Sequence, residues 1–200
     1  MNNEATIYIK NSDYDSAYKI ADEYYERFKL DESEEILNEM YDKLIDEYGT
    51  GSDEAIHCLR KIALINQEKH NFDYALSLYN TVLEWYNQND MLYETDALKT
   101  MVEIATIFSH YNRYDEAYAL LEKAYDISSE EYGKSDSDSC YILFKIADCC
   151  EELGQYEESI LCFEQLIEIY ESDDNDNCAE PLALAYNGLS YTYRKMGQLK

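Results

Sequence analysis

The sequence predicts an all-α protein of about four and a half helix-turn-helix repeats, and three observations carry this prediction. The pair Ile-Ala recurs every 42 residues, starting at Ile20, Ile62, Ile104 and Ile146. Apolar residues around each pair recur at steps of three and four, which is the spacing of one helix face. The 200 residues include one proline and six glycines, a composition that favours helices over strands.

The repeat boundaries follow from the same register. A fifth copy of the pair, Leu189-Ser190, comes 43 residues after the fourth, and the extra residue falls in the polar stretch SDDNDN. We therefore expect the whole chain, residues 1–200, to form a single array. Its repeats cover approximately residues 12–52, 53–94, 95–136 and 137–179, with a partial repeat over 180–200.

The first helix of each repeat, named helix A, carries the Ile-Ala pair. Its copies are expected over residues 12–28, 53–69, 95–111, 137–153 and 180–196. One position in the turn that follows holds His70, Asn112, Gly154 or Gly197. Glycine and asparagine tolerate a left-handed backbone, so this position is expected to end the helix.

The second helix, named helix B, opens on an acidic residue, which suits a helix N-terminus. These residues are Asp31, Asp73, Asp115 and Glu157. A small residue then lets helix A approach closely, at Ser33, Ala75, Ala117 and Ser159. A bulky residue four positions later fills the space towards the next repeat, at Leu37, Tyr79, Leu121 and Phe163.

These features resemble the tetratricopeptide repeat over residues 12–200, most clearly in the sequence Tyr-Asp-Glu-Ala at 114–117. The 42-residue length, with helix B ending at Tyr48-Gly49 or Tyr132-Gly133, resembles the kinesin light chain kind. The resemblance implies a right-handed α-α superhelix, a tetratricopeptide solenoid whose helix A copies line a concave groove. It also implies a protein-interaction function.

Two departures limit what the resemblance implies. Kinesin light chain repeats usually place asparagine before the Ile-Ala pair, and their loops carry His-Pro. Here the position before the pair holds Lys19, Lys61, Glu103, Lys145 and Gly188, and the loops lack His-Pro. We therefore do not transfer kinesin cargo binding, nor a basic clamp for a C-terminal carboxylate.

The register of helix A predicts which residues face the groove. The expected partner-binding residues are Tyr18, His57, Arg60, Lys61, Lys99, Val102, Tyr141, Phe144, Lys145, Asn187 and Tyr191. Other inward positions are Tyr25, Thr106, Asp148 and Arg194. Aromatic and arginine side chains are the usual anchors of binding energy, although the same residues would also suit a solvated groove without a ligand.

The sequence predicts no enzyme, cofactor or metal site. It has no Gly-rich phosphate loop, no G-x-S-x-G and no H-E-x-x-H. Cys149 and Cys150 are adjacent on a helix and point apart, so they cannot chelate together, and Cys150 is expected to be a buried core thiol. The loop from Asp173 to Leu184 lacks the glycine and glutamate of a calcium loop.

The formal charge of −27 and the pI near 4.2 argue against nucleic acid and anionic lipid as partners. Phosphate binding needs clustered Lys and Arg, and the chain has only 16 such residues. No apolar run approaches the ~20 residues that a bilayer requires. The six cysteines show no disulfide-framework spacing, so we expect a cytoplasmic protein with free thiols.

The expected function is a non-enzymatic scaffold that binds a protein or peptide in its groove. The alternative is a regulatory or sensor segment of a larger ATPase, protease or transcriptional regulator, because Gly197–Lys200 aligns with the start of a further helix B. A third possibility is self-association through the last helix. It carries Leu184, Leu189, Tyr193 and Met196 on a face that is expected to lack a covering helix.

Overall fold

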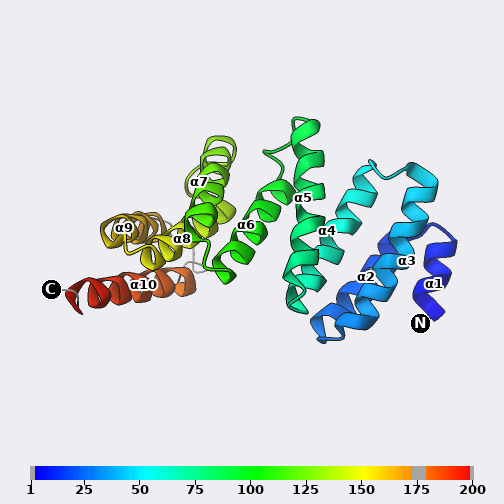
Figure 1. The fold of residues 1–200 in the computed structure, drawn as a ribbon, viewed down its shortest axis with the longest axis horizontal. Helices are drawn as coiled ribbons and strands as arrows, with labels where there is room; N and C mark the ends of the chain where they lie inside the picture. Colours follow the sequence, from blue (N-terminus) through cyan, green and yellow to red (C-terminus); the bar gives the residue numbers. More distant parts are fainter. Residues whose placement is uncertain (1–2, 173–178, 199–200) are drawn as a thin grey trace. The chain divides into compact units, whose positions relative to one another are not determined.

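The computed structural model describes residues 3–172 and 179–198, and within these ranges every regular element is an α-helix. The helices follow the chain as α1 (Asn3–Lys10), α2 (Tyr14–Glu26), α3 (Leu30–Tyr48), α4 (Asp53–Glu68), α5 (Phe72–Gln88), α6 (Thr95–His110), α7 (Tyr114–Glu131), α8 (Ser137–Glu152), α9 (Tyr156–Ser172) and α10 (Ala179–Gln198) (Figure 1). The copies of helix A are α2, α4, α6, α8 and α10. The copies of helix B are α3, α5, α7 and α9, so the predicted helix order is confirmed.

The helices group into two compact units, residues 1–92 and 93–200. Unit 1 holds α1 to α5 and unit 2 holds α6 to α10. Their border lies two residues from the predicted repeat boundary between 94 and 95. Within each unit, successive helices along the chain contact one another, as α4 and α5 do in their antiparallel pair (Figure 1). The organisation of both units into one array stays a prediction.

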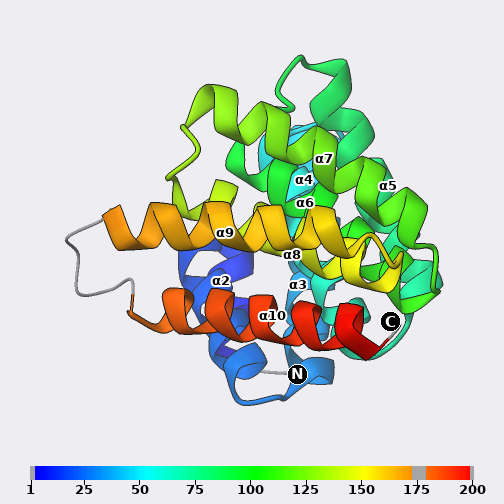
Figure 2. The ribbon, with the colours of Figure 1, turned by 90° about the vertical axis from the view of Figure 1, so that its left-hand side faces the viewer.

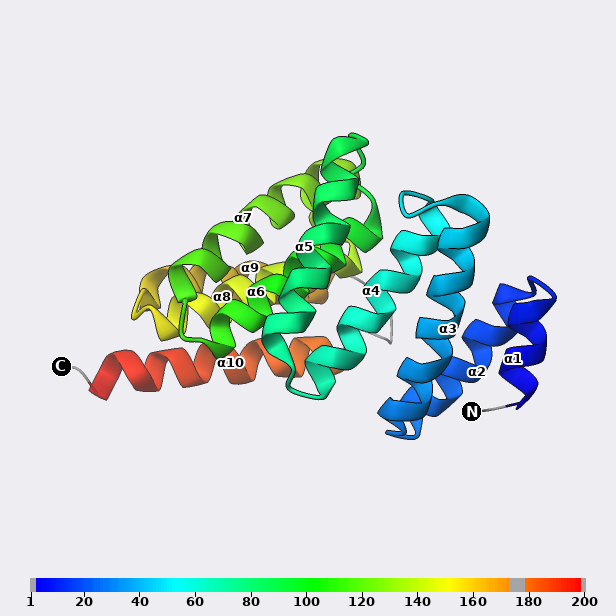
Figure 3. The same cartoon turned by 45° about the vertical axis from the view of Figure 1, so that its right-hand side comes forward.

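Helix α1 precedes the first repeat and has no counterpart in the repeat pattern. It lies against α2 and α3 (Figure 3). Ala5 and Ile9 are one turn apart and are both buried in the core of unit 1. Thr6 donates a 3.0 Å hydrogen bond to Glu39 on α3. The short helix therefore covers the N-terminal face of the first repeat.

The turn between helix A and helix B is the most regular feature of the backbone. Its φ is positive at Phe28, His70, Asn112 and Gly154, with values of 55°, 61°, 58° and 73°. The next backbone N–H donates to the carbonyl five residues earlier, for example from Gln155 to Cys150 at 2.8 Å. This is the Schellman arrangement, which satisfies the last carbonyls of a helix.

Gly197 departs from this rule. A turn was expected there, but α10 continues through Gly197 to Gln198. The expectation was wrong because glycine permits a left-handed backbone without imposing it. Phe28 shows the converse, since a bulky residue adopts the left-handed conformation at a position where the sequence carries no signal for it.

The small and bulky positions of helix B are confirmed as core positions. All four small residues, Ser33, Ala75, Ala117 and Ser159, are buried. All four bulky residues, Leu37, Tyr79, Leu121 and Phe163, are buried as well. Where the small residue is serine, its hydroxyl is satisfied: Ser33 donates a 2.8 Å hydrogen bond to the carbonyl of Ala21 on the preceding helix.

Helices α9 and α10 lie side by side and antiparallel (Figure 2). Their close approach depends on Gly188, because a Cβ there would lie 2.3 Å from Cζ of the buried Phe163. Tyr193 lies on the face that was expected to lack a covering helix and is 51% exposed, whereas Cys150, at the same register position of α8, is buried. Leu184 and Tyr186 are exposed too.

Candidate functional site

The expected groove residues of unit 1 form one contact cluster on α2 and α4. The rings of Tyr18 and His57 meet edge to face with centroids 5.4 Å apart. The ammonium group of Lys61 lies 5.5 Å from the centroid of Tyr18 and 2.6 Å from Oδ1 of Asp22. Burial raises the pKa of Tyr18, so its hydroxyl stays neutral. Arg60 lies half-buried on α4.

Two hollows adjoin this cluster. A cavity of about 280 Å³ between α2, α3 and α4 is lined by residues that include Asp22, Tyr25, Lys61 and Leu64. A more open hollow of about 450 Å³ lies at the N-terminal ends of α2 and α4 and holds Tyr18 and His57. One of its acidic residues, Asp13, caps the N-terminus of α2, where its side chain accepts a 3.2 Å hydrogen bond from the backbone N–H of Ser16.

Three expected residues of α8 differ sharply in their surroundings. Tyr141 is 50% exposed, and the ammonium group of Lys145 lies 5.4 Å from the centroid of its ring. Phe144 instead turns towards the core, where it meets Phe163 edge to face at 5.5 Å. Tyr141 and Lys145 are therefore available to a partner, whereas much of Phe144 is engaged in packing.

The remaining expected residues of unit 2 lie on α6 and α10. Lys99 and Asn187 are exposed. Tyr191 is exposed as well, with the cationic groups of Arg194 and Lys195 at 5.6 Å and 5.2 Å from its ring centroid. Val102 is only 3% exposed. Its apolar side chain therefore lies in the core of unit 2.

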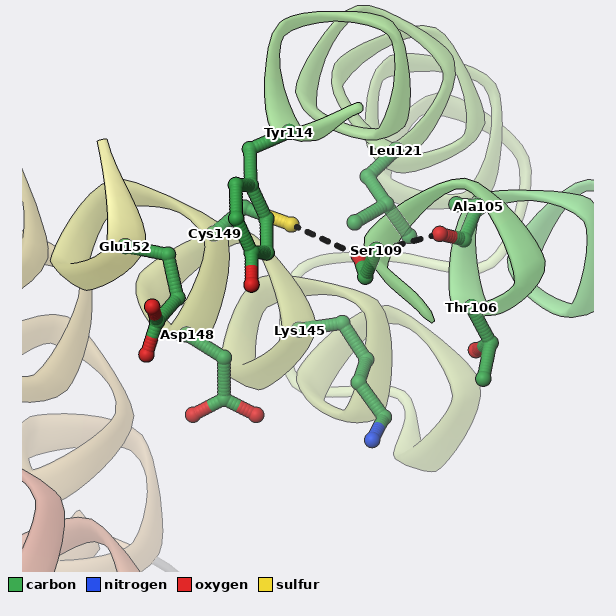
Figure 4. Close-up of a pocket in the computed structure, with 9 residues that line it drawn as sticks. All are labelled: Ala105, Thr106, Ser109, Tyr114, Leu121, Lys145, Asp148, Cys149 and Glu152. Carbon is green, nitrogen blue, oxygen red and sulfur yellow. Dashed lines mark hydrogen bonds between the residues drawn. The ribbon is translucent and has the colours of Figure 1, made fainter. Parts of the chain in front are cut away.

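Unit 2 contains a cavity of about 130 Å³ between α6, α7 and α8 (Figure 4). Its lining consists of Ala105, Thr106, Ser109, Tyr114, Leu121, Lys145, Asp148, Cys149 and Glu152. The side chain of Asp148 lies between those of Glu152 and Lys145 (Figure 4). Thr106, Lys145 and Asp148 were expected as inward residues. Ser109, Tyr114 and Glu152 were missed, although Glu152 follows Asp148 by one helical turn, which brings both to one face.

Burial of Asp148 raises the pKa of its carboxyl group to about 6. The hydroxyl groups beside it are already engaged as donors. Ser109 donates to the carbonyl of Ala105 at 3.0 Å, and Thr106 donates to the carbonyl of Val102 at 2.9 Å. The charged groups of this lining are therefore the ammonium group of Lys145, which lies over the ring of Tyr141, and the acceptor oxygens of Asp148 and Glu152.

The cavities of unit 1 and unit 2 occupy equivalent positions in the repeat. Lys61 and Lys145 are 84 residues apart, which is two repeats, and each lines its cavity. Leu37 and Leu121 correspond in the same way. The charges differ, however, since Asp22 corresponds to Thr106 and Leu64 corresponds to Asp148.

The cysteines of α8 have the properties of core residues. Cys150 is fully buried, as predicted, and burial raises its pKa to about 12. Burial also raises the pKa of Cys149, whose sulfur lies 3.7 Å from the hydroxyl of Ser109. Both thiols stay protonated at neutral pH, so neither is an activated nucleophile.

Across the described ranges, no group of three or more His, Cys, Asp or Glu side chains is placed to hold a metal ion. The calcium-like stretch considered from the sequence falls mostly on residues 173–178, which lie outside the described residues. None of the helices described is both long and apolar enough to cross a bilayer.

Comparison with known proteins finds a family match within unit 2 and solved structures of similar fold. The tetratricopeptide repeat family matches residues 96–172. A kinesin-light-chain-like protein of Podospora anserina with nearly identical TPR-like repeats has 16% identity and a TM-score of 0.81, covering 94% of this chain and 88% of its own. A comparison of the sequence with curated proteins gave no match.

Two further solved structures are longer proteins. Aspartyl phosphate phosphatase F from Bacillus subtilis has 20% identity and a TM-score of 0.69, covering 86% of this chain and 44% of its own. A Rap protein complexed with Competence and Sporulation Factor has 17% identity and a TM-score of 0.67, covering 91% of this chain and 48% of its own. The repeat register, the confirmed helix order and these matches agree: residues 96–172 match the tetratricopeptide repeat family, and this chain has the all-α solenoid fold of the solved structures.

Proposed function

We propose that this protein is a non-enzymatic interaction module that binds a protein or peptide partner on its helix-A surface. This surface is defined as the exposed side chains of α2 and α4 in unit 1 and of α6, α8 and α10 in unit 2. The observation that carries the proposal is the half-exposed ring of Tyr141 beside Lys145. An ordered aromatic ring with a charged neighbour is a typical anchor of a binding surface.

The comparisons support a partner of this kind. The Rap protein of similar fold was solved in a complex with Competence and Sporulation Factor, and by analogy we propose a separate partner for this chain. The acidic net charge of −27 favours proteins over nucleic acids as partners. The buried, protonated thiols of α8 suit a reducing compartment, and we propose the cytoplasm.

The test is a matched capture experiment with extract of the source organism. Three immobilised chains are compared: the parent, a helix-A variant with Lys99→Ala and Tyr141→Ala, and a helix-B variant with Leu161→Ala and Glu164→Gln. All four side chains are exposed in unit 2, so each variant is expected to fold. A partner retained by the parent and the helix-B variant, but lost by the helix-A variant, supports the proposal. A partner lost only by the helix-B variant contradicts it.

A second candidate is a regulatory or sensor segment of a larger multidomain protein. This chain spans 44% of the B. subtilis phosphatase and 48% of the Rap protein, so comparable arrays occur inside longer chains. An immunoblot of source cells measures the native mass. A band well above 23.5 kDa supports the regulatory segment, and a single band at 23.5 kDa removes it.

Self-association through α10 is the third candidate. Leu184, Tyr186 and Tyr193 expose large apolar surfaces on this helix. A second copy that covered them would remove apolar surface from water. Light scattering across a range of concentrations tests this idea. A mass that rises above 23.5 kDa and returns to it in Tyr193→Glu supports self-association, whereas a constant 23.5 kDa rejects it.

A further inference from the structure

We propose that the cavity between α6, α7 and α8 in unit 2 is a subsite for an arginine side chain of the bound peptide. This inference rests on the proposed function and names the chemistry of one anchor in the partner. The cavities of unit 1 and unit 2 occupy equivalent repeat positions but differ in where their acidic residues lie.

In unit 1 the lysine of the cavity has a carboxylate partner, and Glu26 is a further acidic residue of the lining. Lys61 is paired with Asp22 at 2.6 Å, and the position of Asp148 is taken by Leu64. In unit 2 the position of Asp22 is taken by Thr106, and the acid appears on α8 instead. Lys145 lies over the ring of Tyr141. Its charge lowers the pKa of Asp148 against the larger effect of burial, but no ion pair joins the two side chains in the described residues.

The carboxylates of the unit 2 cavity also occupy an unfavourable place on their own helix. Asp148, Glu151 and Glu152 fall in the C-terminal part of α8, whose last turn contains no basic residue. Negative charge at a helix C-terminus opposes the helix dipole. Burial adds to this cost at Asp148, since it disfavours the ionised form. A cation from outside would relieve both effects.

The walls of the cavity suit a guanidinium group better than an ammonium group. Ala105 and Leu121 offer apolar contact for an aliphatic stem, and Tyr114 presents an aromatic ring on the same side as Glu152 (Figure 4). A guanidinium group stacks on aromatic rings and forms paired hydrogen bonds with carboxylates. The volume of about 130 Å³ admits one side chain. Small-molecule sites are usually larger, at ~300–1,000 Å³.

The experiment uses the intact chain and a displayed library of random dodecapeptides at pH 7.5. From the peptides that the parent retains, those that also bind Asp148→Asn are removed. The remaining peptides are labelled, and their affinities are measured by fluorescence anisotropy. Asp126→Asn is the matched control, because Asp126 is an exposed acid on α7 away from the cavity lining. We expect the remaining peptides to share one arginine. Replacing it with citrulline should weaken binding about tenfold, in line with the loss of a charge-assisted hydrogen bond.

The same peptides test the role of Asp148 on the protein side. Asp148→Asn should weaken them about tenfold, and Asp126→Asn should leave the affinity within about twofold. For a control peptide whose arginine is replaced by citrulline, Asp148→Asn should have little further effect. That coupling between one protein carboxylate and one ligand cation would not arise from a general loss of structure.

The affinity of the parent should also fall as the pH is lowered through about 6, where Asp148 takes up a proton. The charged groups that face this carboxyl group on α8 are Lys145, Glu151 and Glu152. From α10, Lys195 approaches Glu151 and Glu152. The other polar residues that line the cavity are Thr106 and Ser109 of α6 and Tyr114 of α7.

Two results would overturn the inference and are distinguishable. If peptides bind the helix-A surface but carry no shared arginine, or are indifferent to Asp148→Asn, the cavity assignment falls and the proposed function stands. If no peptide binds while both variants remain folded by circular dichroism, the arginine subsite falls together with the peptide form of the proposed function.

Discussion

Lys61 and Lys145 occupy the same register position two repeats apart, yet only Lys61 is paired with a carboxylate of the preceding helix A, at 2.6 Å from Asp22. The exchange of Asp22 for Thr106 accounts for the difference, because threonine carries no charge. In unit 1, Lys61 therefore joins α4 to α2 through an ion pair. In unit 2, Lys145 and Asp148 both line a cavity instead. A repeat fold can vary its binding chemistry in this way without changing its core.

The first prediction concerns the stability cost of Asp148. Burial raises its pKa from 3.8 to about 6 in the folded state. Between these two values the folded state binds more protons than the unfolded state, so stability is lost as the pH rises through about 6. Asp148→Asn should therefore raise the free energy of unfolding at pH 7.5 by about 1 kcal/mol, with a smaller gain at pH 4.

Urea unfolding of the parent and Asp148→Asn at both pH values measures this effect. Asp126→Asn serves as the control, and its stability should change little at either pH. A loss of stability in Asp148→Asn at pH 7.5 would show that the carboxylate makes a favourable contact in the folded state. The account of an uncompensated buried charge would then be wrong.

The second prediction concerns the strained turn at Phe28. This residue has a φ of 55° and is 83% exposed, so its ring contributes little burial. A left-handed backbone costs a non-glycine residue roughly 1–2 kcal/mol, and glycine recovers part of this after its own entropy cost. Phe28→Gly should therefore raise the free energy of unfolding by about 0.5–1 kcal/mol.

Phe28→Ala is the matched control, since it removes the ring and keeps the Cβ. Chemical denaturation should show a gain for the glycine variant alone. If Phe28→Gly and Phe28→Ala were equally stable, the left-handed backbone at residue 28 would cost the protein no stability that glycine can restore.

The third prediction concerns the contact between α9 and α10. A Cβ on residue 188 would lie 2.3 Å from Cζ of Phe163, which is fully buried and cannot move aside. Overpacking of this kind costs typically about 1–3 kcal/mol, so Gly188→Ala should destabilise unit 2 by that amount. The double variant Gly188→Ala, Phe163→Leu should lose less stability than the sum of the losses of the two single variants. Thermal unfolding of the four chains of this double-mutant cycle measures the difference. Strict additivity would argue against this contact.

The fourth prediction separates binding from packing on α8. Tyr141 is half exposed, so Tyr141→Ala should change the free energy of unfolding by less than about 0.5 kcal/mol while weakening partner binding. Phe144 packs on Phe163, so Phe144→Ala should cost about 1–3 kcal/mol of stability. Denaturation curves for both variants, beside one affinity measurement, test the distinction. A large stability loss in Tyr141→Ala would remove it as a specific probe of binding.

The repeat register predicted the helices and the core positions closely, because a 42-residue period fixes which residues must be small or bulky. It could not predict α1, because the eight residues of this helix lie outside the repeat and are too few to show a clear helical period. Register alone also assigns a residue to a face without showing how deeply it is buried: Tyr193 is exposed, whereas Cys150 at the same position of α8 is buried.

The binding surface was harder to predict for the same physical reason. Inward positions of helix A differ in depth, so Val102 is buried and Phe144 half-buried, whereas Tyr141 remains exposed. The register also predicted Lys61 and Lys145 as inward residues, but it did not show that Lys61 forms an ion pair with Asp22. That difference depends on Asp22 and Thr106 of the preceding helix, so it appears only when consecutive helices are seen in contact.

The central claim is that partners bind the helix-A surface, and site-specific photocrosslinking tests it most directly. Benzoylphenylalanine replaces Tyr141 on α8 in one chain and Leu161 on α9 in another, since both side chains are well exposed in unit 2. After irradiation in extract of the source organism, we expect a discrete partner adduct from position 141 and none from position 161. An adduct from position 161 alone would place the partner on helix B and contradict the account.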